Sequence, residues 1–257
     1  MKITILGSGA SAGVPIITGE WGACDSQNSK NWRRRASVFV ELGDYNLLID
    51  ASPDLRMQLL DAGINRIDGV LVTHAHADHI MGLDELRQIY LKHRQIIPIY
   101  ADHQTLQALE TTFGYAFRPQ DPHYISFVSP HLITGPFELY GTTIIPFVQK
   151  HGNIESLGYR IGNFAYSTDF NMIPESSLKC LQNLDLWVVD CLRFEPHPTH
   201  IHFDGVMTLI EQLKPKRAIL THLTHWLDYD HLRSLLPSHI EPAYDGMVLE
   251  IPKHDIL

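Results

Sequence analysis

The stretch that most constrains this chain is residues 70–79, which read Val-Leu-Val-Thr-His-Ala-His-Ala-Asp-His. The apolar start predicts a buried strand, and the polar groups directly behind it lose hydration unless they bind something. His74 and His76 are two residues apart, so in an extended segment they point the same way and can bind one ion. Asp78 and His79 follow where a helix is expected to begin, so they can face a second ion. The stretch therefore predicts a pair of metal ions.

The competing interpretation is that these histidines share no function. The chain has 16 His among 257 residues, so a close pair can arise by composition alone, and a solitary pair is more often on the surface. The carboxylate of Asp78 and the ring of His79 in the same turn favour metal binding. Nitrogen and oxygen ligands of this kind suit zinc, manganese or iron, so the metal stays open.

Composition limits the remaining possibilities. With 44% hydrophobic and 19% charged residues, the chain is expected to fold as a single globular domain over residues 1–257. A formal charge of −9 argues against a large nucleic acid or an anionic membrane as partner, although a small phosphorylated ligand remains compatible. Three Cys without a Cys-x-x-Cys pair predict no disulfide framework, and neither a signal segment nor a membrane-spanning stretch is evident. A cytoplasmic protein is expected.

Polar residues recur directly after apolar strands along the chain. Such expected strands lead to Asp50, His151, Asp169, Asp190 and His222. Several strands that each place a His or Asp at one end can bring distant residues to one rim of a sheet. Helices are predicted between them, at residues 55–64, 80–89, 104–112, 206–213 and 232–236. Residues 113–136 are aperiodic and are predicted as loop with some strand.

Two of these features have alternative interpretations. Asp50 is interpreted either as a support for metal ligands or as a cap for the segment Ser52-Pro53-Asp54. The glycine-rich turn at residues 7–13 superficially matches a dinucleotide-binding fingerprint. Its last glycine comes one residue late, and Val14-Pro15 stands where the phosphate-binding helix should begin, so a dinucleotide-binding fold is disfavoured.

In order, the His-x-His-x-Asp-His motif followed by His151, Asp169 and His222 resembles the metal signature of the metallo-β-lactamase superfamily. Gly7-Ser8-Gly9, residues 47–50, residues 158–160 and residues 221–225 further resemble its PhnP branch, which contains phosphoribosyl cyclic phosphodiesterase. The fold that this resemblance implies is α+β, a four-layer αββα sandwich with a two-metal site at one edge.

The resemblance also assigns ligands. It implies that His74, His76 and His151 bind one divalent ion, that Asp78, His79 and His222 bind the other, and that Asp169 bridges the two. Two ions in such an arrangement lower the pKa of bound water and supply hydroxide near neutral pH.

Three further histidines are candidates for catalysis or substrate binding. His200 matches the PhnP-branch histidine proposed as general acid, and imidazole suits proton donation near neutral pH. His202 is the competing choice because it is only two residues away. His225 resembles a site histidine that contacts substrate phosphate, but a packed loop residue is an alternative interpretation.

One departure from the branch is visible. PhnP-like chains often carry a cysteine cluster after the first glycine loop that holds a structural zinc, and here only Cys24 remains. One thiolate cannot form a tetrahedral site without other ligands, so no structural zinc is expected. The loss also leaves the substrate open.

These observations favour a dinuclear metal-dependent phosphodiesterase that acts on a small cyclic, phosphoribosyl or nucleotide-like phosphodiester through a metal-activated hydroxide. The alternatives are a lactone or thioester hydrolase with the same metals, and a non-catalytic metal-binding accessory protein. A tRNA-processing nuclease is disfavoured because no large basic patch is evident. A homodimer is compatible with the sequence.

Overall fold

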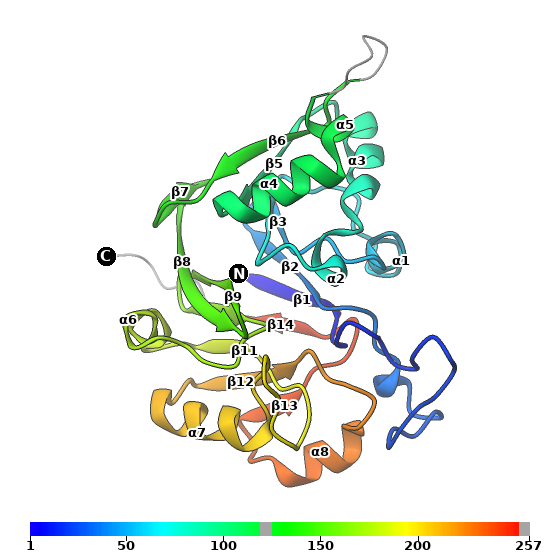
Figure 1. Cartoon of the computed structure of the whole chain (residues 1–257), viewed down its shortest axis with the longest axis vertical. Coiled ribbons are helices and arrows are strands. Elements are labelled where there is room, and N and C mark those ends of the chain that lie inside the picture. Colours follow the sequence, from blue (N-terminus) through cyan, green and yellow to red (C-terminus); the bar gives the residue numbers. More distant parts are fainter. Residues whose placement is uncertain (119–124, 252–257) are drawn as a thin grey trace.

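The computed structural model describes residues 1–118 and 125–251, and in them the strands form two seven-stranded sheets (Figure 1). The first sheet has the order β14-β1-β2-β3-β4-β5-β6, and the second has the order β13-β12-β11-β10-β9-β8-β7. The strands of the first sheet are β1 Lys2–Gly7, β2 Ser37–Leu42, β3 Tyr45–Ile49, β4 Gly69–Leu71, β5 Ile97–Ala101, β6 Val128–Leu132 and β14 Val248–Glu250. Those of the second are β7 Phe137–Leu139, β8 Thr142–His151, β9 Ile154–Ile161, β10 Phe164–Ser167, β11 Leu186–Asp190, β12 Arg217–Thr221 and β13 Ile240–Pro242.

Helices cover the outer faces of the two sheets. On the first sheet lie α1 Leu55–Asp61, α2 Ala77–Ile80, α3 Leu86–His93, α4 His103–Thr112 and α5 Gly114–Phe117. On the second lie α6 Glu175–Leu178, α7 Phe203–Leu213 and α8 Tyr229–Leu235. Short 3-10 turns occur at Ser29–Asn31, Leu83–Glu85 and Lys179–Leu181. Among the described residues, no helix is both long and apolar enough to cross a membrane.

Side-chain alternation along the strands produces three hydrophobic layers. In β2, Val38 and Val40 pack between the two sheets, while Phe39 points the other way, toward the helices of the first sheet. In β11, Val188 likewise faces the other sheet and Val189 faces the helices of the second. Because successive strand residues point to opposite faces, apolar runs such as these are expected only where both faces are covered. The predicted four-layer αββα sandwich is confirmed.

The direction of the strands decides where polar residues gather. Strands β3, β4, β5 and β6 are parallel neighbours in one sheet, and β10, β11, β12 and β13 are parallel neighbours in the other. Carboxyl ends of parallel strands meet at one edge of a sheet, where ligands commonly bind. The residues that follow β3, β4, β10 and β12 therefore come together, and His151 joins them at the end of the long strand β8.

Local expectations differ from the structure at three places. The helix predicted at residues 80–89 is divided into the end of α2, a 3-10 turn at Leu83–Glu85 and the start of α3. The strand predicted through Val72 ends at Leu71, so His74 and His76 lie in the loop before α2. The segment predicted as loop with some strand contains the one-turn helix α5 and strand β6, while residues 119–124 lie outside the described part. A four-residue helix is too short to show helical periodicity in a sequence.

Candidate metal centre

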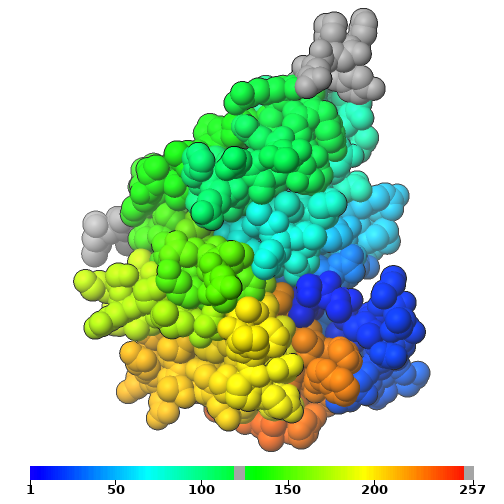
Figure 2. Space-filling model, viewed as in Figure 1, coloured from blue at the N-terminus to red at the C-terminus, as the bar shows by residue number. Residues whose placement is uncertain are grey.

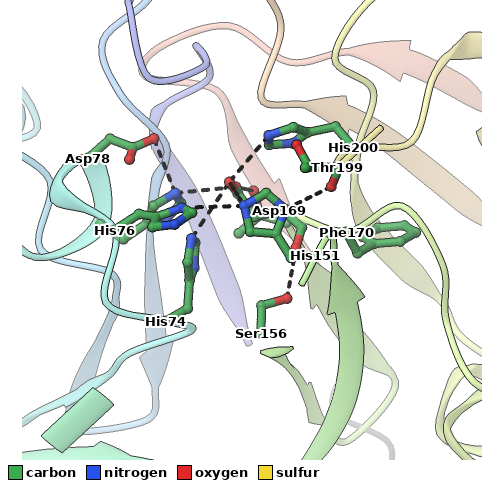
Figure 3. A network of polar contacts seen from close by, with 12 residues as sticks. His74, His76, Asp78, His151, Ser156, Asp169, Phe170, Thr199 and His200 are labelled. Carbon is green, nitrogen blue, oxygen red and sulfur yellow. Dashed lines mark hydrogen bonds and ion pairs between the residues drawn. The ribbon is translucent and has the colours of Figure 1, made fainter. Parts of the chain in front are cut away.

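Four side chains form a first group of potential ligands, at the side of the site nearest the loop after β4. The ligand atoms of His74, His76, His151 and Asp169 all lie within 4.8 Å of one another. The Asp169 Oδ2 atom is 3.7 Å from Nε2 of His74 and 3.6 Å from Nε2 of His151. Nδ1 of His76 lies 3.3 Å from Nε2 of His151 (Figure 3). The four ligand atoms are thus close enough together to bind a single ion.

The second group shares Asp169 with the first. Its other members are Asp78, His79 and His222. The Asp169 Oδ1 atom is 3.2 Å from Nε2 of His79 and 3.2 Å from Nε2 of His222. Asp78 Oδ2 lies 3.3 Å from the same nitrogen of His79 and 3.8 Å from that of His222. One carboxylate oxygen of Asp169 thus faces each group.

Three of the histidine nitrogens that face the cluster lack hydrogen bonds, which tests whether a cation fits. Nε2 of His74, His79 and His222 is buried and has no hydrogen-bond partner. A buried polar atom without a partner costs on the order of 1–3 kcal/mol, so three of them pointing into one cluster would be unfavourable by themselves. Imidazole nitrogens and carboxylate oxygens are ligands of zinc, manganese and iron, and such an ion would satisfy all three nitrogens.

The electrostatics of the cluster also fit a cation. Burial lowers the pKa of His79, but the Asp169, Asp50 and Asp78 carboxylates outweigh it and hold that pKa well above its ordinary value. Burial acts in the same direction on His222, yet Asp169 and Asp190 raise its pKa to about 10. The buried carboxylates therefore attract positive charge to this place, and a divalent ion can supply it in place of protons.

The protein holds the outer ring nitrogens of His74, His79 and His151. Nδ1 of His79 lies 2.7 Å from Asp50 Oδ2, and Nδ1 of His151 lies 2.7 Å from the Thr199 carbonyl oxygen. Nδ1 of His74 is 3.0 Å from Thr73 Oγ1. Contacts of this kind fix the ring orientation and the tautomer, and they leave Nε2 free for a metal.

Asp50 sits behind the second group rather than at a cap. Besides its contact with His79, it accepts hydrogen bonds from the backbone N–H of Thr73 at 2.8 Å and from Thr73 Oγ1 at 2.9 Å. It is fully buried; burial raises its pKa, while His79 and Thr73 act to lower it. The Asp54 N–H, which a cap would serve, instead donates to Ser52 Oγ.

Three site residues adopt left-handed backbone conformations. Asp50, Asp169 and His222 have φ values of 63°, 53° and 58°, and they follow β3, β10 and β12 closely. A residue other than glycine in this region costs on the order of 1 kcal/mol, so such positions cluster at functional sites. The turns aim these side chains across the strand ends toward the centre. Thr168 Oγ1 also donates to Asp169 Oδ1 at 2.8 Å.

Of the two candidate general acids, the structure brings His200 to the cluster. Its Nε2 lies 3.9 Å from Asp169 Oδ2, and its ring stacks on that of His222 with centroids 5.0 Å apart. Its Nδ1 lies 3.1 Å from Asp190 Oδ2. His202 instead forms the N-cap of α7 and belongs to none of the groups of potential ligands.

His225 lies away from the cluster in the described structure. Its backbone oxygen accepts from the Ala23 N–H at 2.9 Å, and its ring lies against Trp226 with centroids 4.6 Å apart. A Cβ atom at Gly22 would lie 2.4 Å from Cδ2 of the His225 ring, so the ring packs against this glycine. His225 is also absent from the residues that line the pocket over the cluster. Its predicted contact with substrate remains a prediction.

A pocket of about 390 Å³ opens over both groups. Besides the cluster it is lined by Ser11, Asn153, Ile154 and Thr199. None of these was predicted as a site residue. The sequence places Asp190 at the end of an expected strand but assigns it no role, and the structure brings its carboxylate to His200 and His222.

Comparisons with known proteins agree with this geometry. Residues 45–223 match the family model described as Beta-lactamase superfamily domain. A solved structure described as a new diphosphatase from the PhnP family is 38% identical, covers 96% of both chains and has a TM-score of 0.90. Zn²⁺-bound PqqB from Methylobacterium extorquens is 21% identical and covers 98% of this chain and 100% of its own, with a TM-score of 0.76, which shows the shared fold.

A curated relative is longer than this chain. The octanoyltransferase of Porphyromonas gingivalis (strain ATCC BAA-308 / W83) is 36% identical over 96% of this chain but only 51% of its own length. The chain thus spans about half the length of that relative.

Fold and site together define a metal-dependent hydrolase. The chain belongs to the metallo-β-lactamase superfamily and, within it, to the PhnP family.

Proposed function

We propose that this protein is a dinuclear metal-dependent phosphodiesterase that hydrolyses a small cyclic phosphodiester of the phosphoribosyl or nucleotide-like kind. The observation that carries the proposal is the position of Asp169, whose two carboxylate oxygens face two separate sets of ligand atoms. A carboxylate between two cations is the usual core of a two-metal site for phosphoryl chemistry. Zinc or manganese, with iron as a further option, fits the donor set.

When bound, two such ions supply Lewis acidity and water of lowered pKa. The residues of this chain do the rest. Fixed rings at His74, His79 and His151 keep the ligand atoms in place without reorganisation, because their outer nitrogens are already engaged. The pocket volume suits a small molecule, and the chain's charge of −9 does not favour an extended polyanion.

His200 is the proton donor in this proposal. Asp190 Oδ2 accepts a hydrogen bond from Nδ1–H of His200, so the Nε2 atom of that ring faces the pocket. A proton on Nε2 can there be transferred to a departing alkoxide. The fully buried Asp190 carboxylate fixes the orientation of the ring. His202 has no comparable carboxylate contact among the described residues.

Two other substrate classes have specific support. The PhnP-family structure that is 38% identical is described as a diphosphatase, which favours a linear phosphoanhydride. The relative named octanoyltransferase favours the alternative of an acyl thioester, attacked at a carbonyl in the same site. About half of that relative has no counterpart in this chain, so its named activity supports the thioester less directly than the cluster supports phosphoryl transfer.

The test is a substrate panel with manganese-loaded and zinc-loaded protein. It compares ribose 1,2-cyclic phosphate, 2′,3′-cyclic AMP, ADP-ribose as a diphosphate and octanoyl-coenzyme A as a thioester. We expect the highest kcat/KM with a cyclic phosphodiester. Highest activity with ADP-ribose would move the assignment to the phosphoanhydride, and hydrolysis of the thioester alone would overturn it.

A further inference from the structure

The glycine-rich turn at residues 7–13 is tied directly to the metal cluster. The Leu223 N–H donates to the Ser8 carbonyl oxygen at 2.9 Å, and the Ala10 N–H donates to the Leu223 carbonyl oxygen at 3.2 Å. Leu223 follows His222 immediately in the chain. The position of this turn is therefore coupled to the position of a potential metal ligand.

The turn is anchored on its other side as well. Asp245 accepts hydrogen bonds from the Ser8 N–H at 2.9 Å and from Ser8 Oγ at 2.8 Å, and the Gly9 N–H donates to the Arg34 carbonyl oxygen at 2.8 Å. A side chain at Gly9 would meet Arg33 Cβ at 2.9 Å, so the two segments approach more closely than other residues allow. The Gly13 N–H closes the turn on the Ala10 carbonyl oxygen at 2.8 Å.

Ser11 stands at the tip of this anchored turn and lines the pocket together with Asp78 and His222. It is exposed, and its hydroxyl group has no hydrogen-bond partner in the part of the chain that the structure describes. In Figure 2 the dark blue N-terminal segment adjoins cyan, yellow and orange surface, and segments of these colours contribute several other residues of the site. A hydroxyl group on a rigid turn can bind a ligand at a low cost in conformational entropy, because the turn is already ordered before binding.

Asn153 also lines the pocket. It follows His151 in the turn between β8 and β9, and its side chain is exposed. The Gly152 N–H donates to Asn171 Oδ1 at 2.8 Å, and a side chain at Gly152 would meet Thr199 Cγ2 at 2.6 Å. This turn, too, is held in place beside the first group of ligands.

We propose that Ser11 is a specificity-determining residue, whose hydroxyl binds a hydroxyl group on the organic part of the substrate while the phosphoryl group lies over the metal cluster. Asn153, which lines the same pocket, makes a second contact of this kind. Such contacts require a substrate whose organic part carries hydroxyl groups, as a sugar or another polyol does. This inference rests on the proposed phosphodiesterase function, and it concerns binding of the part that does not react.

The competing interpretation is that Ser11 is an ordinary exposed turn residue. Serine is common in turns, where its side chain often bonds to the nearby backbone. In the described part of the chain, the Ser11 hydroxyl makes no such hydrogen bond to the backbone, and Ser11 lines the pocket. Loss of one neutral hydrogen bond to a ligand is expected to weaken binding about tenfold.

Calorimetric titration of the manganese-loaded protein tests this directly, with D-ribose 5-phosphate and inorganic phosphate as probes. The variants are Ser11→Ala, Asn153→Ala and, as a matched control, Ser238→Ala, an exposed serine before β13 at the other end of the sheet. Ser11→Ala should raise the Kd of ribose 5-phosphate about tenfold and that of inorganic phosphate less than threefold. The control should change neither.

Two results would overturn the inference. One is that the unaltered protein binds ribose 5-phosphate no more tightly than inorganic phosphate. The other is that Ser11→Ala weakens both probes equally, which would show a general disturbance of the site. These titrations need no turnover, so a failure of the proposed phosphodiesterase activity shows up separately, in the substrate panel.

Discussion

The Asp190 Oδ2 atom lies 3.1 Å from Nδ1 of His200, which leaves the other ring nitrogen of that histidine facing Asp169. The second oxygen of the same carboxylate lies 3.6 Å from Nδ1 of His222. One buried side chain thus supports both the candidate proton donor and a candidate metal ligand. Asp190 therefore positions the two histidines and does not itself contact the substrate.

Asp190→Asn should therefore impair proton donation more than metal binding. A neutral amide stabilises a positive imidazole poorly, so kcat with an alkoxide leaving group should fall about 100-fold, within the usual range for general acid catalysis. With 4-nitrophenolate, which leaves without a proton, the loss should be much smaller. Equal losses for both leaving groups at full metal content would show that Asp190 only maintains the fold. Metal content is measured by elemental analysis in parallel.

A matched pair of variants separates the two candidate acids. His200→Ala should lower kcat for a cyclic phosphodiester by 10²–10⁴-fold, the usual range for general acid catalysis, and retain the metal. His202→Ala should keep most of the activity, because His202 lies at the start of α7. Steady-state kinetics of both variants shows which histidine is the general acid. The assignment fails if the His202 variant is the inactive one.

Asp50→Asn should weaken metal binding without removing a ligand. Its carboxylate fixes Nδ1 of His79, and loss of such a contact typically lowers metal affinity 10–100-fold. Competition with a chromophoric chelator measures the change. Asp44→Asn, in the exposed turn between β2 and β3, is the control and should bind metal normally. An unchanged affinity in the Asp50 variant would contradict the role assigned to this side chain.

Much of this site could be anticipated from sequence, and what could not is instructive. His74, His76, Asp78 and His79 are contiguous, so local spacing alone predicts that they act together. Asp169 and His222 are predicted as site residues because each comes directly after an expected apolar strand, in the order along the chain that the family signature requires. The fold follows from the same strands, because alternating burial of residues such as Val38 and Phe39 requires cover on both faces.

The supporting residues were harder to predict. Asp190 also follows an apolar strand, but its partner His200 lies ten residues later in a segment without periodicity, so nothing in the sequence links the two. Ser11 and Asn153 reach the pocket only because the turn at residues 7–13 packs against Leu223 and the turn between β8 and β9 packs against Thr199. Such contacts depend on the packing of loops, which leaves no local pattern.

Asp245 predicts how stability depends on pH. Burial raises its pKa to about 6, against an ordinary value of 3.8, while the Ser8 and Arg34 donors act to lower it. Because the folded chain then holds this proton more tightly than the unfolded chain, its contribution is fully present at low pH and is lost as the pH rises from about 4 to 6. The contribution amounts to about 3 kcal/mol, since each pKa unit corresponds to ~1.4 kcal/mol.

Denaturant unfolding of the metal-free protein at several pH values measures this effect. The free energy of unfolding of the unaltered protein, relative to that of Asp245→Asn, should rise as the pH falls from 7 to 4. Taking the difference cancels the titration of the histidines, which both proteins share. Parallel curves for the two proteins over this range would show that Asp245 has no raised pKa.

Anomalous diffraction from crystals of manganese- or zinc-loaded protein tests the two-metal site most directly. We predict two peaks per chain, one against His74, His76 and His151 and the other against Asp78, His79 and His222, with Asp169 between them. Elemental analysis of the same sample should give two tightly bound ions and no third, structural zinc near Cys24. A single peak, or peaks away from Asp169, would contradict a dinuclear centre.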